Sequence, residues 1–232
     1  MTIFRYDPAI LNTFPDINGG VMFATNLSNG STPDKLKTAF ETEQQVVLAR
    51  LGEVPLSEVP SLADWRAAYR KFGTDPTKYR NAAEALLRRL TKKGDIPSIN
   101  TLVDIGNMVS IRYALPVAVF DTRDIQGTVT VRFADGSERF TELGSTEALH
   151  PDPGEVIFVD ESGMVLARRW CWRQSAQTTA REDTTEAIIT VEAQGEENIG
   201  RALNDLLLLL DKYTGGNFNH DVLSSSVPSI SF

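Results

Sequence analysis

The chain has 232 residues, of which 41% are hydrophobic and 23% charged, and its net charge is -8. These values are ordinary for a globular protein and allow one large domain or two small ones. The single cysteine, Cys171, excludes an internal disulfide and a cysteine-rich zinc site. The longest aliphatic run, residues 206–210, is far shorter than the ~20 residues of a membrane span. Since the N-terminus also lacks the layout of a signal peptide, we expect a cytoplasmic protein without a membrane partner.

One segment of the chain is basic, although the net charge of the whole chain is negative. Between Arg66 and Lys93 the chain carries nine Lys or Arg and only two acids, Asp75 and Glu84. A cationic helical surface can bind phosphate groups even on an acidic protein, with an affinity that falls steeply as salt is added. The alternative is a solvated helix face without a partner, and charge alone favours that alternative.

Cap residues and helix breakers predict three helices in the first half of the chain. The first starts at Thr32-Pro-Asp34 and has apolar spacing from Leu36 to Leu48, the second starts at a capping box, Ser61–Asp64, and ends at Gly73, and the third runs from Asn81 to Gly94. Between residues 104 and 107 we expect a tight polar turn.

The second half reads mainly as strands. The expected elements are a buried strand at 117–120, a hairpin of 127–133 with 138–141 around Asp135-Gly136, a second hairpin of 155–159 with 164–172, a strand at 187–191, a leucine-rich helix at 199–213 and a loose tail at 217–232. Helices, then strands, then one helix predict an α+β single domain built in layers, which spans residues 1–216. A doubly wound parallel sheet would need a regular strand-helix alternation that is missing.

Common catalytic motifs are absent from the sequence. It has no Walker loop, no G-x-S-x-G elbow and no ligand spacing for a metal, and its two histidines, His150 and His220, fall in a loop and the tail. We therefore expect no cofactor and no metal. Asp104 and Asn107 flank Gly106, where their side chains could either hold a turn or bind a ligand.

Two tryptophans in the segment from Arg168 to Gln174 allow two interpretations. If this segment is a strand, Trp170 and Trp172 lie on one face. Tryptophans at alternate positions are more often core residues, which is the favoured interpretation, and the neighbouring arginines support the alternative of a platform for stacking a base or an aromatic ligand. Glu192 stands one step beyond an apolar strand, where an acid can simply reach solvent.

The order and spacing of these segments resemble the B3/4 domain, which belongs to the β subunit of bacterial phenylalanyl-tRNA synthetase and also occurs free-standing. The chain looks like the free-standing branch, and the resemblance covers about residues 60–213, with 1–59 as an extension packed on it. It is carried by Trp65, Tyr69–Gly73, Pro76, Lys78–Arg80, Glu84–Arg89, Val103-Asp104, Asn107, Val109-Ser110, Arg112-Tyr113, Pro116, Asp121, Trp170–Ser175 and Arg181–Glu192.

The resemblance implies a three-layer α/β sandwich with mixed and antiparallel sheets and helices before and after them. It also implies an editing site that hydrolyses tyrosine wrongly esterified to tRNA. In the family an Asp-x-Thr-Asn segment lines the amino-acid pocket, and here Asp104-Ile-Gly106-Asn107 takes its place. Ala118 replaces the pocket histidine, and Glu192 matches a glutamate that reads the tyrosine hydroxyl. Because threonine and histidine are lost, tyrosine specificity does not transfer.

The resemblance thus gives every candidate residue a role. Asn107 and Glu192 would line the pocket and orient the ester and its water. The remaining candidates are Asp104, Gly106, Ala118, Trp170 and Trp172 for the substrate, and Arg70, Lys78, Arg80, Arg88 and Arg89 for the phosphates of the acceptor end of an aminoacyl-tRNA. A positioned water and the tRNA's own hydroxyl could then suffice for hydrolysis.

Three functions follow as hypotheses. The first is a hydrolase that clears a mischarged amino acid from tRNA. The second is a non-catalytic module that binds tRNA or an amino acid, which the missing threonine and histidine favour. The third is a protein-interaction domain, which the negative net charge and the leucine-rich helix suggest. A complete tRNA ligase is excluded, since the catalytic core of such an enzyme has no room in this chain.

Overall fold

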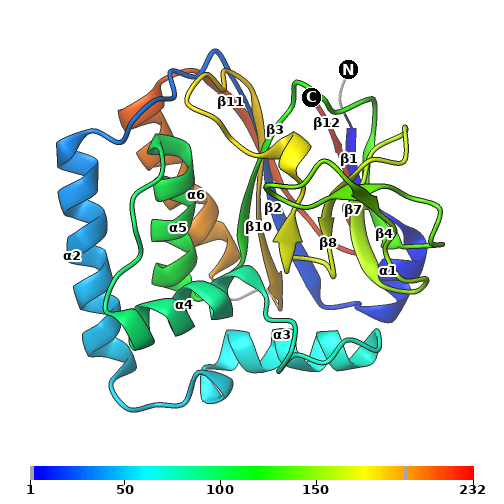
Figure 1. Cartoon of the computed structure of the whole chain (residues 1–232), viewed down its shortest axis with the longest axis horizontal. Helices are drawn as coiled ribbons and strands as arrows, with labels where there is room; N and C mark the ends of the chain where they lie inside the picture. Colours follow the sequence, from blue (N-terminus) through cyan, green and yellow to red (C-terminus); the bar gives the residue numbers. More distant parts are fainter. Residues whose placement is uncertain (1–2, 196–197) are drawn as a thin grey trace.

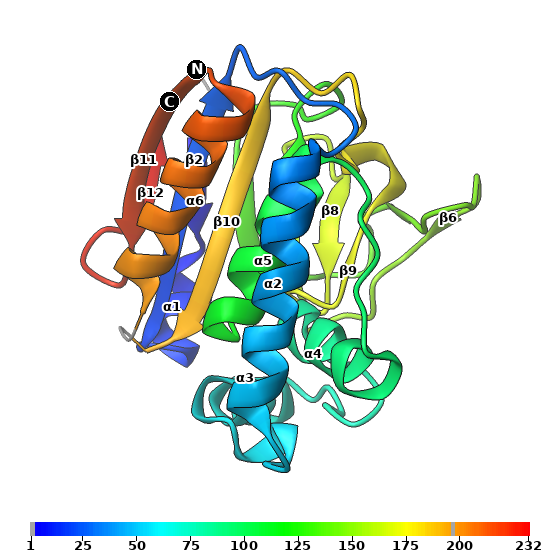
Figure 2. The ribbon, with the colours of Figure 1, turned by 90° about the vertical axis from the view of Figure 1, so that its left-hand side faces the viewer.

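Three layers make up the computed structural model, which describes residues 3–195 and 198–232. Helices that pack on the outer face of a four-stranded sheet form the first layer, that sheet is the second and a six-stranded sheet is the third (Figures 1 and 2). The predicted α+β class and three-layer sandwich are confirmed. The helices are α1 (Pro8–Thr13), α2 (Asp34–Leu51), α3 (Pro60–Lys71), α4 (Ala82–Lys93), α5 (Thr101–Tyr113) and α6 (Ile199–Thr214), with 3-10 turns at Leu56–Glu58 and Ala176–Thr178.

Both large sheets mix segments from the two ends of the chain. The four-stranded sheet has the order β11 (Asn217–Leu223), β2 (Ile17–Thr25), β10 (Ala187–Gln194), β3 (Val117–Asp121) and is antiparallel throughout. The six-stranded sheet has the order β12 (Ser229–Ser231), β1 (Ile3–Tyr6), β4 (Val129–Phe133), β7 (Val156–Val159), β8 (Val165–Arg168), β9 (Arg173–Gln174). A small arm pairs β5 (Phe140–Thr141) with β6 (Ala148–Leu149).

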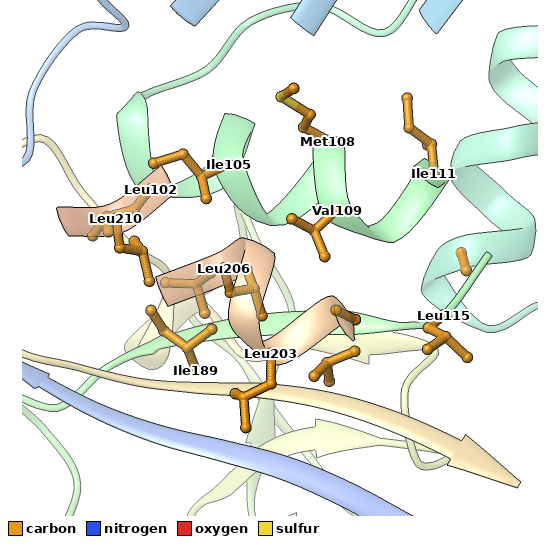
Figure 3. Packing of buried hydrophobic residues seen from close by; sticks show 14 of the residues in the cluster. Leu102, Ile105, Met108, Val109, Ile111, Leu115, Ile189, Leu203, Leu206 and Leu210 are labelled. Atoms are coloured by element: carbon orange, nitrogen blue, oxygen red, sulfur yellow. The ribbon is translucent and has the colours of Figure 1, made fainter. Parts of the chain in front are cut away.

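The four-stranded sheet separates two hydrophobic cores. Alternate side chains of β10 point to opposite faces, as the pleat requires. Ile189 packs among α5 and α6 in the first core, which Figure 3 shows from close by. Ile188 packs between the two sheets in the second core. Every candidate residue on β3 or β10 can therefore be assigned to a face.

Local cap chemistry predicted the helices well. Asn81 accepts a hydrogen bond from the Glu84 amide at the start of α4, and Gly94 ends that helix in the left-handed conformation, with φ of 82°. The predicted helices at 34–48 and 199–213 correspond to α2 and α6. At α3 the expected capping box is wrong, because the N-cap is Val59 and it has no side-chain hydrogen bond.

The expected polar turn at residues 104–107 is also wrong. These residues lie inside α5, which begins after the Asn100 cap. Gly106 serves close packing there, since a Cβ would lie 3.3 Å from Val119 and 3.4 Å from Val117 on β3. A glycine that suggests a turn in the sequence thus lets a helix approach a strand.

Strand pairing follows the sequence in one hairpin and not in the other. The second predicted hairpin forms from β7 and β8. The first is wrong, because β4 pairs with β1 and β7 while β5 pairs with β6. Its Asp135-Gly136 turn is fixed instead by the buried carboxylate of Glu138, which accepts hydrogen bonds from both of these amides.

The expected tail and extension are integral parts of the two sheets. Instead of a loose tail, residues 217–223 form β11 and residues 229–231 form β12. Likewise residues 1–59 do not merely pack on the domain, since β2 lies between β11 and β10. The polar pattern of β11, in which only Leu223 is buried, gave no strand signal in the sequence.

Candidate nucleic-acid interface and buried carboxylate

A cationic hollow lies where α4 meets the segment after β8. It has a volume of about 480 Å³. Its lining consists of Lys78, Arg80, Ala85, Arg88, Arg89, Lys92, Lys93, Trp172 and Arg173. We call this set the cationic hollow. Seven of these lining residues are cations and none is an acid, so the hollow is suited to an anion.

Local structure explains why these charges converge. Asn81 fixes the start of α4, and helical spacing then brings Arg88 and Lys92, four residues apart, to the same face. The backbone amide of Ala82 donates to the carbonyl oxygen of Cys171 over 2.8 Å, which ties the helix to the segment that carries Trp172.

Most of these cations remain available. Among the described residues, the ion pairs of the hollow involve three of its cations: Arg80 with Glu84, Arg89 with Asp95, and Arg173 with Glu142. None of these pairs includes Lys78, Arg88, Lys92 or Lys93. Four positive charges can thus meet an external anion without first breaking an ion pair seen in the structure.

An aromatic rim borders the hollow. The rings of Tyr79 and Trp172 pack edge to face, with centroids 4.9 Å apart. Two guanidinium groups stack on them: Arg169 lies 3.9 Å from the centroid of Tyr79, and Arg173 lies 4.7 Å from that of Trp172. Planar cations and a half-buried indole beside a charged hollow are the elements that single-stranded nucleic acids use for stacking.

The other candidate residues fall at two separate places, the first of which is Glu192 between the two sheets. Its carboxylate accepts a hydrogen bond from the Tyr6 hydroxyl over 2.5 Å and from Nε1 of Trp170 over 3.1 Å. The side chain is only 2% exposed. Gly19, which faces Glu192 on β2, leaves room for the Tyr6 hydroxyl, because a Cβ there would overlap it.

Burial dominates the electrostatics of Glu192. Loss of hydration raises the pKa of Glu192 to about 7, although the hydrogen bonds from Tyr6 and Trp170 lower it in part. Burial, followed by the neighbouring Glu192 charge, also raises the pKa of Tyr6. Cys171 has a raised pKa for the same reasons, so it is no activated nucleophile.

The second place lies behind the four-stranded sheet, on α5. Asp104 is fully buried and accepts hydrogen bonds from the Thr32 hydroxyl, the Ser98 hydroxyl and the Ile99 amide. This carboxylate fastens the entry to α5, which is the structural one of its two predicted roles. Gly106 packs on β3, and Asn107 is half-buried on the same helix.

Asn107 and Glu192 consequently do not share a pocket. α5 packs on the face of the sheet that carries Val117 and Val119, whereas Glu192 lies with Trp170 on the opposite face, between the sheets. Ala118 lies on that inner face too, paired with Thr190. The expected pocket floored by both elements is wrong, because the sheet separates them and Trp170 fills the space next to Glu192.

The two tryptophans lie in different surroundings. Arg169 and Trp170 adopt left-handed backbone, with φ of 46° and 60°, so residues 169–172 form a turn and not the expected strand. Trp170 enters the core against Phe14 and Trp65, with centroids 4.9 and 5.1 Å away. Trp172 reaches the cationic hollow, so each tryptophan fits one of the two interpretations.

Of the five residues expected to contact RNA, four come together in the hollow: Lys78, Arg80, Arg88 and Arg89. Arg70 is exposed on α3 and does not line it. Sequence reasoning missed Arg173, Lys92 and Lys93 as site residues. The two lysines belonged to the basic segment already counted, but the place of Arg173 depends on the turn at 169–172.

The described residues offer neither a membrane-spanning helix nor a metal-binding cluster. In the part of the chain that the structure describes, no helix is long and apolar enough to cross a membrane. Within residues 3–195 and 198–232, no group of three or more His, Cys, Asp or Glu is placed to hold a metal ion.

Comparisons with known proteins point to one family. The chain is similar to the phenylalanine–tRNA ligase β subunit of Shewanella oneidensis, at 30% identity over 98 residues, which cover 42% of this chain and 12% of that protein. Against the same subunit of Bradyrhizobium diazoefficiens the identity is 34% over 119 residues, 51% of this chain and 14% of that protein. The chain therefore spans only about an eighth of the length of these relatives.

A solved structure and a family model complete the comparison. An N-terminal fragment of the phenylalanyl-tRNA synthetase β subunit from Pyrococcus horikoshii aligns with 94% of this chain and 50% of its own, at a TM-score of 0.49 and 15% identity. The model of the B3/4 domain matches residues 64–209, which is more than half of the chain. The chain belongs to the B3/4 domain family.

Proposed function

We propose that this protein binds tRNA through the cationic hollow and holds a single-stranded end of it there. The observation that carries the proposal is the convergence of seven cations and Trp172 in one hollow of about 480 Å³. Phosphates would pair with Lys78, Arg88 and the two lysines that end α4, and a base would stack on Trp172. The relatives named above are tRNA ligase subunits, which makes tRNA the natural RNA to test.

The hollow suits a single strand better than a duplex. Stacking on Trp172 requires a base whose face is free, and the paired bases of a helix do not offer one. The edge-to-face contact with Tyr79 and the guanidinium of Arg173 hold the indole in place before a ligand arrives. Such pre-organisation lowers the entropy that binding costs.

Binding is tested by titrating labelled tRNA and following fluorescence anisotropy at several salt concentrations. If four phosphates are neutralised, log K should fall with log salt with a slope of about -3. The double substitution Arg88→Ala/Lys92→Ala should weaken binding and make the slope shallower by about 1.4. Lys35→Ala/Lys37→Ala on α2 is the matched control, because these exposed lysines lie outside the hollow.

Two results would contradict this proposal. One is the absence of tRNA binding at low salt by the folded protein. The other is an equal affinity for the Arg88→Ala/Lys92→Ala variant and the wild type, since the binding site would then lie elsewhere.

Hydrolysis of an aminoacyl ester on tRNA is the second candidate. It is favoured by the carboxylate of Glu192, because a pKa of about 7 suits a general base at neutral pH. Both oxygens of that carboxylate are already hydrogen-bonded, Oε1 by Tyr6 and Oε2 by Trp170, and the residue is only 2% exposed. Catalysis would therefore require the turn at 169–172 to open, so the observed geometry supports binding better than turnover.

A panel of misacylated tRNAs separates the two candidates. Binding without release of the amino acid supports a module that only holds tRNA. Release that disappears in Glu192→Gln while tRNA affinity is kept would instead assign catalysis to the buried carboxylate.

A further inference from the structure

A second hollow, of about 410 Å³, lies next to the cationic hollow. The two share Arg80, Arg88 and Lys92, so the same three cations face both hollows. Unlike the cationic hollow, the second hollow has two acids in its lining, the exposed Glu53 and the buried Glu84. The buried Glu84 is the feature that neither the basic segment nor the RNA proposal explains.

The carboxylate of Glu84 is held by one oxygen only. Its Oε1 accepts a hydrogen bond from Nη1 of Arg66 over 2.7 Å and lies 3.6 Å from Nε of Arg80. Its Oε2 is buried and has no hydrogen-bond partner among the described residues, and the side chain as a whole is only 6% exposed. A buried acceptor without a donor is costly, so a ligand that supplies a donor gains affinity here.

The surroundings restrict what that ligand can be. Arg66, Arg80, Arg88 and Lys92 attract a phosphate and repel an ammonium group. The donor must therefore be a neutral N–H or O–H on a molecule that also carries negative charge. A nucleotide whose base has an exocyclic amino group meets both conditions, and a glutamate that accepts from the N4 amino group of cytosine is a known form of base recognition.

We propose that the second hollow holds the nucleotide adjacent to the one bound in the cationic hollow, and that Glu84 reads its base by accepting a hydrogen bond from an exocyclic amino group. This inference rests on the RNA binding proposed above and adds base selectivity to it. Uracil carries a carbonyl where cytosine carries the amino group, so it would place an acceptor against the carboxylate and bind less tightly.

The substitution Glu84→Gln provides a sharp test. Arg66 can only donate, so it keeps the amide oxygen of the new side chain at the position of Oε1. The amide NH₂ then takes the position of Oε2, and an acceptor becomes a donor. The preference should therefore reverse from cytosine to uracil.

The experiment compares the affinity of the full chain for hexamers of cytidylate and of uridylate. The wild type should bind the cytidylate hexamer roughly tenfold more tightly, and Glu84→Gln should favour the uridylate hexamer. Glu53→Gln is the matched control, because it removes the same charge from an exposed glutamate of the same hollow and should keep the preference for cytosine. The ratio of the two affinities is measured within one variant and does not depend on how much of that variant is folded.

The outcomes also distinguish the two proposals. If both hexamers bind with equal affinity, or if Glu84→Gln leaves the ratio unchanged, base reading by Glu84 is overturned while RNA binding stands. If neither hexamer nor tRNA binds to the folded protein at low salt, the RNA-binding function itself is overturned, and base reading with it.

Discussion

The indole of Trp170 donates its N–H to Oε2 of Glu192 over 3.1 Å, across the space between the two sheets. The contact connects two residues from different structural elements. Trp170 belongs to the turn whose next side chains reach the cationic hollow, and Glu192 belongs to the central strand β10. Among the described residues this buried acid has two hydrogen-bond donors and no ion pair, so its ionisation makes stability depend on pH, and this gives the first prediction.

Stability should fall as pH rises, because of Glu192. Its pKa rises from 4.5 to about 7 on folding, so between these values the folded state binds more protons than the unfolded state. The stabilisation is complete below pH 4.5 and is lost as the pH rises through 7, by about 3 kcal/mol in total. Glu192→Gln should remove this dependence. Urea unfolding between pH 5 and 9, followed by tryptophan fluorescence, measures it, and parallel curves for both proteins would contradict the assignment.

Gly19→Ala should destabilise the protein through one contact. A methyl group at this position overlaps the Tyr6 hydroxyl and displaces it from Glu192. We expect a loss of about 2 kcal/mol in the free energy of unfolding. In a Tyr6→Phe background the loss should be smaller by about 1 kcal/mol, because the overlapping oxygen is gone. An equal loss in both backgrounds would place the strain in the strand backbone instead.

Trp172→Ala should weaken binding of single-stranded RNA by about 1 to 3 kcal/mol, because it removes the stacking surface. Trp172→Phe should retain most of the affinity, since an aromatic face remains. The salt dependence should stay the same in both variants, because no charge is removed. If affinity changes only together with the salt dependence, Trp172 acts by positioning the neighbouring arginines.

Asp104 and Asn107 should differ sharply when each is replaced by alanine. Asp104→Ala removes a fully buried, charged acceptor that the donors of Thr32, Ser98 and Ile99 share, which should cost about 3 kcal/mol of stability. Asn107→Ala should cost about 0.5 kcal/mol, as expected for a half-buried side chain outside such a network. Thermal unfolding of both variants decides this, and similar losses would contradict the structural role of Asp104.

Sequence reasoning succeeded where a structure depends on neighbours in the chain. The Asn81 cap and the Gly94 stop are set within one helix, and so is the clustering of Arg88 with Arg89. It failed where the local structure depends on contacts between segments that are far apart in the sequence. The turn at 169–172 uses left-handed backbone at two residues that are not glycine, which no local rule favours. Tyr6 and Glu192 are 186 residues apart in the sequence, so the burial of the Glu192 carboxylate could not be inferred from the residues that flank either of them.

The pairing of β1 with β12 sets Ile3 beside Ser231, so the first and last strands of the described chain lie next to each other at one edge of the six-stranded sheet (Figure 1). A short linker could therefore join the two ends, and the ring could be cut at an exposed loop such as 143–147 to give a circular permutant. Because the two ends lie close together, the whole domain could also be inserted into a surface loop of another protein without separating the two sides of that loop.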